Sequence, residues 1–130
     1  MKEFTSYDKE LALYILRQIE NAIQQIQTRT SAIHCAADFL ISPERMEKLD
    51  AVCMQFIAIG ESLKGLDKVT GRKLLHTDTS IPWKKIMGLR DIIAHHYFDV
   101  DADEIWWIIE NELNPLLNSV RNFINNVSSV

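Results

Sequence analysis

The sequence contains few of the residues that form tight turns, and this scarcity limits the fold. Its 130 residues include only four glycines and three prolines, too few for the turns that join many short β-strands. The stretches between them are rich in Ala, Leu, Ile, Gln, Glu and Lys, which favour helices. We therefore predict an all-α fold, an up-and-down bundle of four to five helices that forms a single domain over residues 1–130.

Other features that are missing bear on location and chemistry. No apolar run approaches the length of a membrane span, and residues 1–10 are polar and charged, unlike a signal peptide. We therefore expect a cytoplasmic protein with no membrane partner. The two cysteines, Cys35 and Cys53, lie far apart and lack metal-ligand spacing, which predicts buried free thiols. Neither a metal ion nor another cofactor is expected.

The charge is unevenly distributed along the chain. A net charge of −4 argues against a protein that coats nucleic acid indiscriminately. Residues 64–96 nevertheless hold seven Lys and Arg against three acids, a net charge of +4, while the remainder has a net charge of −8. This segment forms either an ordinary solvated surface or a local basic face for a phosphate-bearing ligand. Its candidate phosphate contacts are Arg72, Lys73, Lys84 and Lys85.

Local signals place the first helices. Apolar residues recur every three or four positions over residues 11–26, and Thr5 or Ser6 could cap the start of that helix. Residues 32–40 predict a short, weaker helix. Ser42 as N-cap followed by Pro43 marks the start of a longer helix, whose apolar circumference is typical of a central bundle element.

Gly60 falls in the middle of this longer helix, where glycine costs roughly 1 kcal/mol relative to alanine. Its presence indicates close approach of a neighbouring helix. The adjacent Glu61 is either a surface carboxylate or a residue near the functional site.

The last helix begins at Asp101, which together with Glu104 resembles a capping box. Pro115 cannot donate a hydrogen bond and should kink this helix. Trp106 and Trp107 cannot both face inward, because neighbouring helical residues differ by about 100° in direction.

The reactive side chains concentrate in residues 82–98, which we predict to form one helix. A fixed cation, an acid, two titratable bases and a phenol occur there within eight residues: Arg90, Asp91, His95, His96 and Tyr97. Asp91 and His95 share a helix face, so the carboxylate could orient the imidazole.

Arg90 and His95 diverge by about 140° on an ideal helix, so they cannot easily converge on one atom. Either the helix unwinds near His95, or two copies of the chain meet across a two-fold axis and complete a shared cleft. We favour the second alternative, because pairing would also cover an apolar side of the helix formed by Ile86, Leu89 and Ile93.

An arginine and a histidine without a metal-ligand set suit metal-independent cleavage of RNA, in which the 2′-hydroxyl is the nucleophile. His95 would act as general base or acid, and Arg90 would neutralise charge on the phosphoryl oxygens. The alternative is that both residues merely cap and solvate a helix end.

A set of motifs resembles the HepT-like branch of the HEPN superfamily over nearly the whole chain. These motifs are Arg90-x4-His95-x-Tyr97, the flanking Ile81-Pro82-Trp83 and Phe98-Asp99-Val100, the later Trp106, Ile109, Glu110, Asn111, Leu113 and Pro115, and the earlier Ile59-Gly60-Glu61.

The resemblance implies a homodimeric helical bundle with its cleft at the dimer interface. It also implies a ribonuclease toxin of a type VII-like toxin–antitoxin pair, whose partner is a small nucleotidyltransferase of the MNT type. By matching position, Arg90 and His95 would be catalytic, and Tyr97 would accept AMP from the antitoxin.

Two positions depart from the family pattern. Asp91 replaces a frequent asparagine, and His96 stands where an acid is common. The charge of Asp91 would either weaken RNA binding or orient His95. Two other classes of function stay open: a catalytically silent module that docks a nucleotidyltransferase or a nucleotide, and a structural dimer in which the motif only caps helices.

Overall fold

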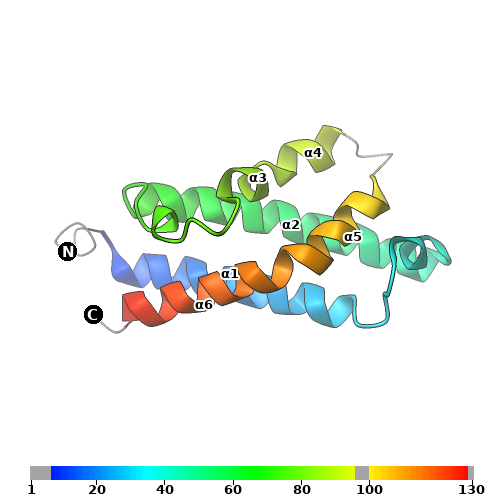
Figure 1. Cartoon of the computed structure of the whole chain (residues 1–130), viewed down its shortest axis with the longest axis horizontal. Helices are drawn as coiled ribbons and strands as arrows, with labels where there is room; N and C mark the ends of the chain where they lie inside the picture. Colours follow the sequence, from blue (N-terminus) through cyan, green and yellow to red (C-terminus); the bar gives the residue numbers. More distant parts are fainter. Residues whose placement is uncertain (1–6, 96–99, 129–130) are drawn as a thin grey trace.

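The computed structural model describes residues 7–95 and 100–128 (Figure 1). The α-helices in these ranges are α1 (Lys9–Arg29), α2 (Pro43–Val69), α3 (Trp83–Met87), α4 (Leu89–His95), α5 (Ala102–Asn111) and α6 (Leu113–Ser128). Two short 3-10 helices, η2 (Ala36–Leu40) and η3 (Leu75–Thr77), lie in the connections. The described ranges contain no β-strand, which confirms the predicted all-α class.

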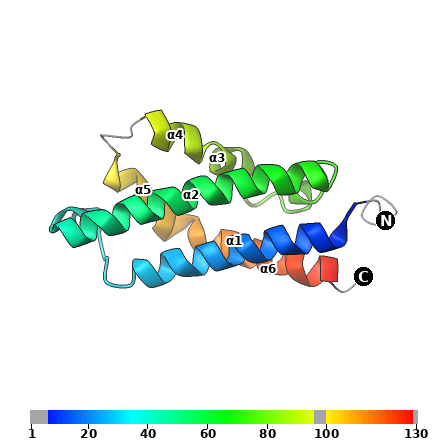
Figure 2. The same ribbon diagram turned by 180° about the vertical axis from the view of Figure 1, so that it is seen from behind.

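The helices form four columns that alternate in direction (Figures 1 and 2). The columns are α1, α2, the pair α3 and α4, and the pair α5 and α6. Helix α1 packs against α2 and α6, while α3 and α4 lie on α2. Helix α1 therefore begins at the end of the bundle where α6 finishes, and the up-and-down arrangement is confirmed.

Side-chain caps determine where several helices begin. Ser42 Oγ accepts a hydrogen bond from Arg45 N at 3.2 Å, and Pro43 follows as the first helical residue, both as predicted. Asp101 Oδ1 accepts from the backbone N–H groups of the second and third residues after it, which confirms this N-cap. Helix α1 is capped by Asp8, which accepts from Leu11 N, rather than by Thr5 or Ser6, which lie outside the described residues.

Two predicted helices are shorter than expected. Only Ala36–Leu40 of residues 32–40 is helical, as a 3-10 turn. The last helix is divided near Pro115, because α5 stops at Asn111 and α6 starts at Leu113. Pro115 has no N–H to offer the Asn111 carbonyl, so the α-helical ladder cannot continue through this point.

The two adjacent tryptophans divide between the core and the solvent, as predicted. Trp106 packs edge-on against Phe39, with ring centroids 6.2 Å apart, whereas Trp107 is 48% exposed. The cysteines are both free, but only Cys53 is buried. The prediction that Cys35 is buried was wrong, because Cys35 precedes η2 on an exposed connection.

Helix α2 is the central element of the bundle. Its buried residues face α1 on one side and the pair α3 and α4 on the other. A Cβ atom built on Gly60 would lie 3.1 Å from the carbonyl oxygen of Ile86 and 3.4 Å from that of Met87. The predicted close approach at Gly60 is therefore confirmed, and it places α3 against α2.

Candidate functional site

Residues 82–98 do not form the single helix that the sequence predicts. Helix α3 ends at Met87, and α4 starts at Leu89. Between them, the Gly88 N–H donates to the carbonyl oxygens of Lys84 and Lys85 at 3.1 and 3.2 Å, which closes the last turn of α3. The break at Gly88 therefore divides the segment into a supporting helix and a helix that carries the motif.

Trp83 fixes the start of α3. Its indole is 6% exposed and packs at 5.8 Å from the ring of Phe123 on α6. Its Nε1–H donates to the Asp78 carbonyl oxygen at 2.8 Å. Pro82 is the N-cap residue rather than part of the first turn, so Trp83 is the first helical residue.

The apolar side of α3 and α4 is used within this chain. Ile86, Leu89 and Ile93 are only 2%, 2% and 5% exposed. The prediction that these residues supply a surface for a second copy was wrong, because the apolar circumference of α2 requires cover and α3 and α4 provide it. Ile92, at 39% exposed, is the large apolar residue that α4 presents to solvent.

Arg90 and Asp91 lie on the solvent side of α4. Both are exposed, and neither side chain has a polar partner within the described parts of the chain. The backbone stays helical to His95, so positions 90 and 95 remain about 140° apart, and unwinding before His95 gains no support. The side chain of His95 and the predicted site residues His96 and Tyr97 lie outside the described residues.

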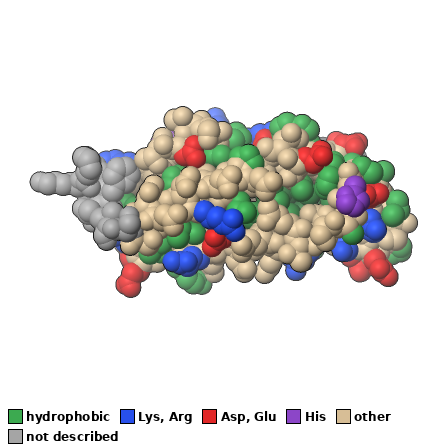
Figure 3. Space-filling view, turned by 60° about the horizontal axis from the view of Figure 1, so that its bottom comes forward, with side chains coloured by type: hydrophobic (Ala, Val, Ile, Leu, Met, Phe, Trp, Pro, Cys, Tyr) green, Lys and Arg blue, Asp and Glu red, His purple; other side chains and the backbone are tan. Residues whose placement is uncertain are grey.

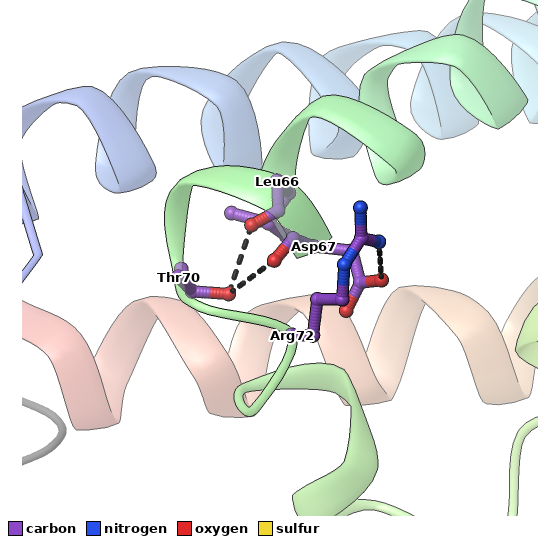
Figure 4. Close-up of polar contacts among 4 residues, drawn as sticks. All are labelled: Leu66, Asp67, Thr70 and Arg72. Carbon is purple, nitrogen blue, oxygen red and sulfur yellow. Dashed lines mark hydrogen bonds and ion pairs between the residues drawn. The ribbon is translucent and has the colours of Figure 1, made fainter.

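Two of the four candidate phosphate contacts are engaged elsewhere. Arg72 Nη1 lies 3.3 Å from Asp67 Oδ2 at the end of α2, beside the hydrogen bonds of Thr70 to the Leu66 and Asp67 carbonyls (Figure 4). Lys85 Nζ lies 2.9 Å from Glu112 Oε1 and 4.4 Å from the ring centroid of Trp107.

Lys73 and Lys84 remain exposed, and neither has a side-chain partner among the residues that the structure describes. Glu61 is also exposed and forms an ion pair with Lys64 at 3.2 Å. Among the described residues, these contacts leave Arg90, Lys73 and Lys84 as the unpaired cations of the candidate site.

Two large hollows in the described part of the chain adjoin the α3 and α4 segment, and sequence reasoning found neither. The first, about 590 Å³, lies between η2, α4 and the start of α5, and its lining includes Leu40 and Ile92 together with Asp101, Asp103 and Glu104. Its three acids make it a poor phosphate site. The second, about 640 Å³, lies beside the start of α3 and is lined by His76, Thr79, Pro82 and Lys84, among others.

The charged side chains on the side of the bundle formed by α1 and α6 do not suggest a second phosphate-binding surface. On the part drawn in colour, Lys and Arg side chains are scattered among acids and do not form a continuous basic patch (Figure 3). Residues 7–95 and 100–128 contain no group of three or more His, Cys, Asp or Glu side chains that could hold a metal ion. No helix in those residues is long and apolar enough to cross a membrane.

The protein is therefore an all-α up-and-down bundle. An exposed arginine, Arg90, lies on its short helix α4, which ends at His95. A family model described as ribonuclease HepT-like matches residues 19–123. The chain belongs to this HepT-like family.

Individual relatives agree with this assignment. A protein of Thermococcus cleftensis named probable ribonuclease HepT is 32% identical over 101 residues, which are 78% of this chain and 84% of that protein. Two others, provisionally named as RNases, are 36% identical over 66 residues in Caldanaerobacter subterraneus subsp. tengcongensis and 29% identical over 77 residues in Methanocaldococcus jannaschii. The chain spans only 55% and 60% of these two proteins. No solved structure matches the chain significantly.

Proposed function

We propose that the protein is a metal-independent endoribonuclease that uses Arg90 and His95. The observation that carries this proposal is the solvent-facing Arg90, which has no polar partner among the described residues, on a helix that ends at His95 in a chain of the HepT-like family. The names of the relatives support RNA as the substrate.

The chemistry needs a proton acceptor and a stabiliser of negative charge. His95 removes the proton from a ribose 2′-hydroxyl, whose oxygen attacks the adjacent phosphorus, and the bond to the 5′-oxygen of the next nucleotide breaks. Arg90 neutralises the charge that develops on the phosphoryl oxygens. The leaving 5′-oxygen takes a proton from water, and the products are a cyclic phosphate and a free 5′-hydroxyl. Asp91 orients His95, and His96 supports the same site.

The reactive groups come together between two copies of the chain. Because α4 is helical through His95, Arg90 and His95 of one copy face different directions. A two-fold axis beside α4 brings Arg90 of one copy towards His95 of the other. The exposed Ile92, on the same helix, provides an apolar contact for such a homodimer in place of the buried side of the helix.

The proposed partner is a nucleotidyltransferase antitoxin of the MNT type, which transfers AMP to Tyr97 in a type VII-like toxin–antitoxin pair in the cytoplasm. Positions 90 and 97 are seven residues apart, so on a continuing helix they would share a stripe. The phosphate of an adenylylated Tyr97 would pair with Arg90 and exclude the RNA phosphate. The alternative function is a catalytically silent module that docks the nucleotidyltransferase or a nucleotide.

Incubation of purified protein with total RNA, with and without EDTA, tests the activity. The variants Arg90→Ala and His95→Ala should lose cleavage, and EDTA should not affect the wild-type protein. Arg17→Ala and His34→Ala are matched controls, because both residues are exposed and lie on other elements of the chain. Equal cleavage by all five proteins would identify a contaminating nuclease.

Intact-mass measurement tests the modification. After incubation with the nucleotidyltransferase and ATP, the wild-type protein and Tyr14→Phe should gain the mass of AMP, whereas Tyr97→Phe should not. Tyr14 is a suitable control because it is 61% exposed on α1. Added mass that persists in Tyr97→Phe would assign the modification to another residue.

A further inference from the structure

The second hollow has the features of a binding site separate from Arg90 and His95. It is open to solvent and lies between the connection that follows η3 and the start of α3. Ile81, Pro82 and Trp83 supply apolar surface, while His76, Lys84 and Lys85 supply polar and cationic groups.

The charges around this hollow differ in their availability. Lys85 is held by Glu112. Lys84 is exposed and unpaired within the described residues, so its ammonium group is free for an anion. The acid in the lining, Asp78, accepts hydrogen bonds from Ser119 Oγ at 2.6 Å, Ser80 Oγ at 2.6 Å and Ser80 N at 3.0 Å. Both of its carboxylate oxygens are therefore engaged, one of them by α6.

The same contacts hold the wall of the hollow in place. Asp78 is tied to α6 through Ser119, and its carbonyl oxygen accepts from the Trp83 indole. Thr77 Oγ1 donates to the Leu74 carbonyl at 2.6 Å. A site built in advance avoids the entropic cost of ordering a loop when a ligand binds.

We propose that this hollow binds a segment of single-stranded RNA next to the bond that is cut, which rests on the proposed ribonuclease function. Lys84 binds a backbone phosphate, and the exposed imidazole of His76 and the ring of Pro82 pack against a base or sugar. Lys84 on α3 and Arg90 on α4 are six residues apart in the sequence, on either side of the Gly88 turn. The open side of the hollow lets the strand continue beyond it.

Binding of an RNA oligonucleotide with 2′-O-methyl groups at every position measures this contact without cleavage. Followed by fluorescence anisotropy, Lys84→Ala should weaken binding and reduce the slope of log K against log salt by about 0.7, the value for one phosphate contact on a single strand. His76→Ala should weaken binding about fivefold or more through lost stacking, with little change of the slope. Lys84→Arg should retain the wild-type slope.

The matched control is Lys48→Ala, which removes the same charge near the start of α2, where Lys48 donates to the Arg29 carbonyl. Wild-type affinity and slope in both Lys84→Ala and His76→Ala would overturn the proposal. Equal competition by inorganic phosphate or AMP at the concentration of the oligonucleotide would also overturn it, because the occupant would then be a small anion.

Cleavage assays separate this inference from the proposed function. If the wild-type protein cuts no RNA but RNA binding depends on Lys84 and His76, the proposal of RNA binding in the hollow is supported and the ribonuclease proposal is wrong. If cleavage depends on Arg90 but RNA binding does not depend on Lys84 or His76, the ribonuclease proposal is supported and the proposal of RNA binding in the hollow is wrong.

Discussion

Gly60 of α2 and Ile86 of α3 approach so closely that a Cβ atom at position 60 would lie 3.1 Å from the Ile86 carbonyl oxygen. The neighbouring atoms are backbone, which cannot rotate away as a side chain can. This contact sets how near α3 lies to α2.

Replacement of Gly60 by alanine should therefore destabilise the protein, although alanine is the better helix former. Displacement of α3 should cost about 1–3 kcal/mol, more than the roughly 1 kcal/mol gained in helix propensity. Gly65→Ala is the matched control, because nothing lies within 4 Å of its added Cβ and it sits in the same helix. Urea unfolding followed by circular dichroism should show Gly60→Ala less stable and Gly65→Ala more stable than the wild-type protein. The opposite order would mean that α3 adapts without cost.

Mixing two inactive variants tests whether the site is shared between copies. In a heterodimer of Arg90→Ala and His95→Ala, one of the two shared sites keeps both residues, whereas the other loses both. Random exchange of subunits should then restore about a quarter of the wild-type cleavage, because half of the dimers carry one intact site of two. Cleavage by the mixture is compared with that of each variant alone. A mixture as inactive as its components would place both residues within one chain.

The Asp78 and Ser119 pair predicts a pH-dependent stability. The hydrogen bond from Ser119, followed by that from Ser80, lowers the pKa of the Asp78 carboxyl below its usual value. A lowered folded-state pKa stabilises the protein above the unfolded pKa of about 3.9, and this contribution is lost as the pH falls through the lower folded value.

Ser119→Ala should accordingly lower the free energy of unfolding by about 1–2 kcal/mol at neutral pH, and the difference should shrink as Asp78 is protonated. Ser128→Ala is the control, because Ser128 donates to the neutral Ile124 carbonyl on the same helix. Its effect should not vary over the same pH range in denaturant titrations. A pH-independent effect of Ser119→Ala would rule out the carboxylate as the cause.

The two thiols should react differently with alkylating reagents. Burial, followed by the charge of Asp50, raises the pKa of Cys53 to about 11, so its reactive thiolate is scarce at pH 8. Cys35 is exposed. Iodoacetamide should therefore modify Cys35 in the folded protein and Cys53 only after unfolding, as peptide mass spectrometry can determine. Rapid modification of Cys53 without denaturant would indicate local opening of α2.

Features that depend on nearby residues could be predicted from the sequence. The caps at Ser42 and Asp101 follow from side chains that reach backbone groups two or three residues away. The close approach at Gly60 could be predicted because glycine inside a long helix is unfavourable unless a neighbouring atom excludes a side chain. That atom is the carbonyl oxygen of Ile86.

Features that depend on distant residues could not be predicted. The spacing of Ile86, Leu89 and Ile93 is the same whether they cover α2 or a second chain, so their burial within the protomer needed the structure. The hollow near Lys84 depends on the hydrogen bond between Ser119 and Asp78, which are 41 positions apart. The break at Gly88 had a local signal, the glycine itself, which the apolar periodicity obscured.

Because of the turn at Gly88, the rotation of α4 about its axis is not fixed by the rotation of α3. In an uninterrupted helix, the direction of Lys84 would dictate the direction of Arg90, and any repacking of Trp83 would rotate both. With α3 ending at Met87 and α4 beginning at Leu89, the burial of Leu89 and Ile93 keeps Arg90 aimed at solvent. A substitution at Lys84 can thus change the binding of an RNA strand without changing the direction of the Arg90 guanidinium.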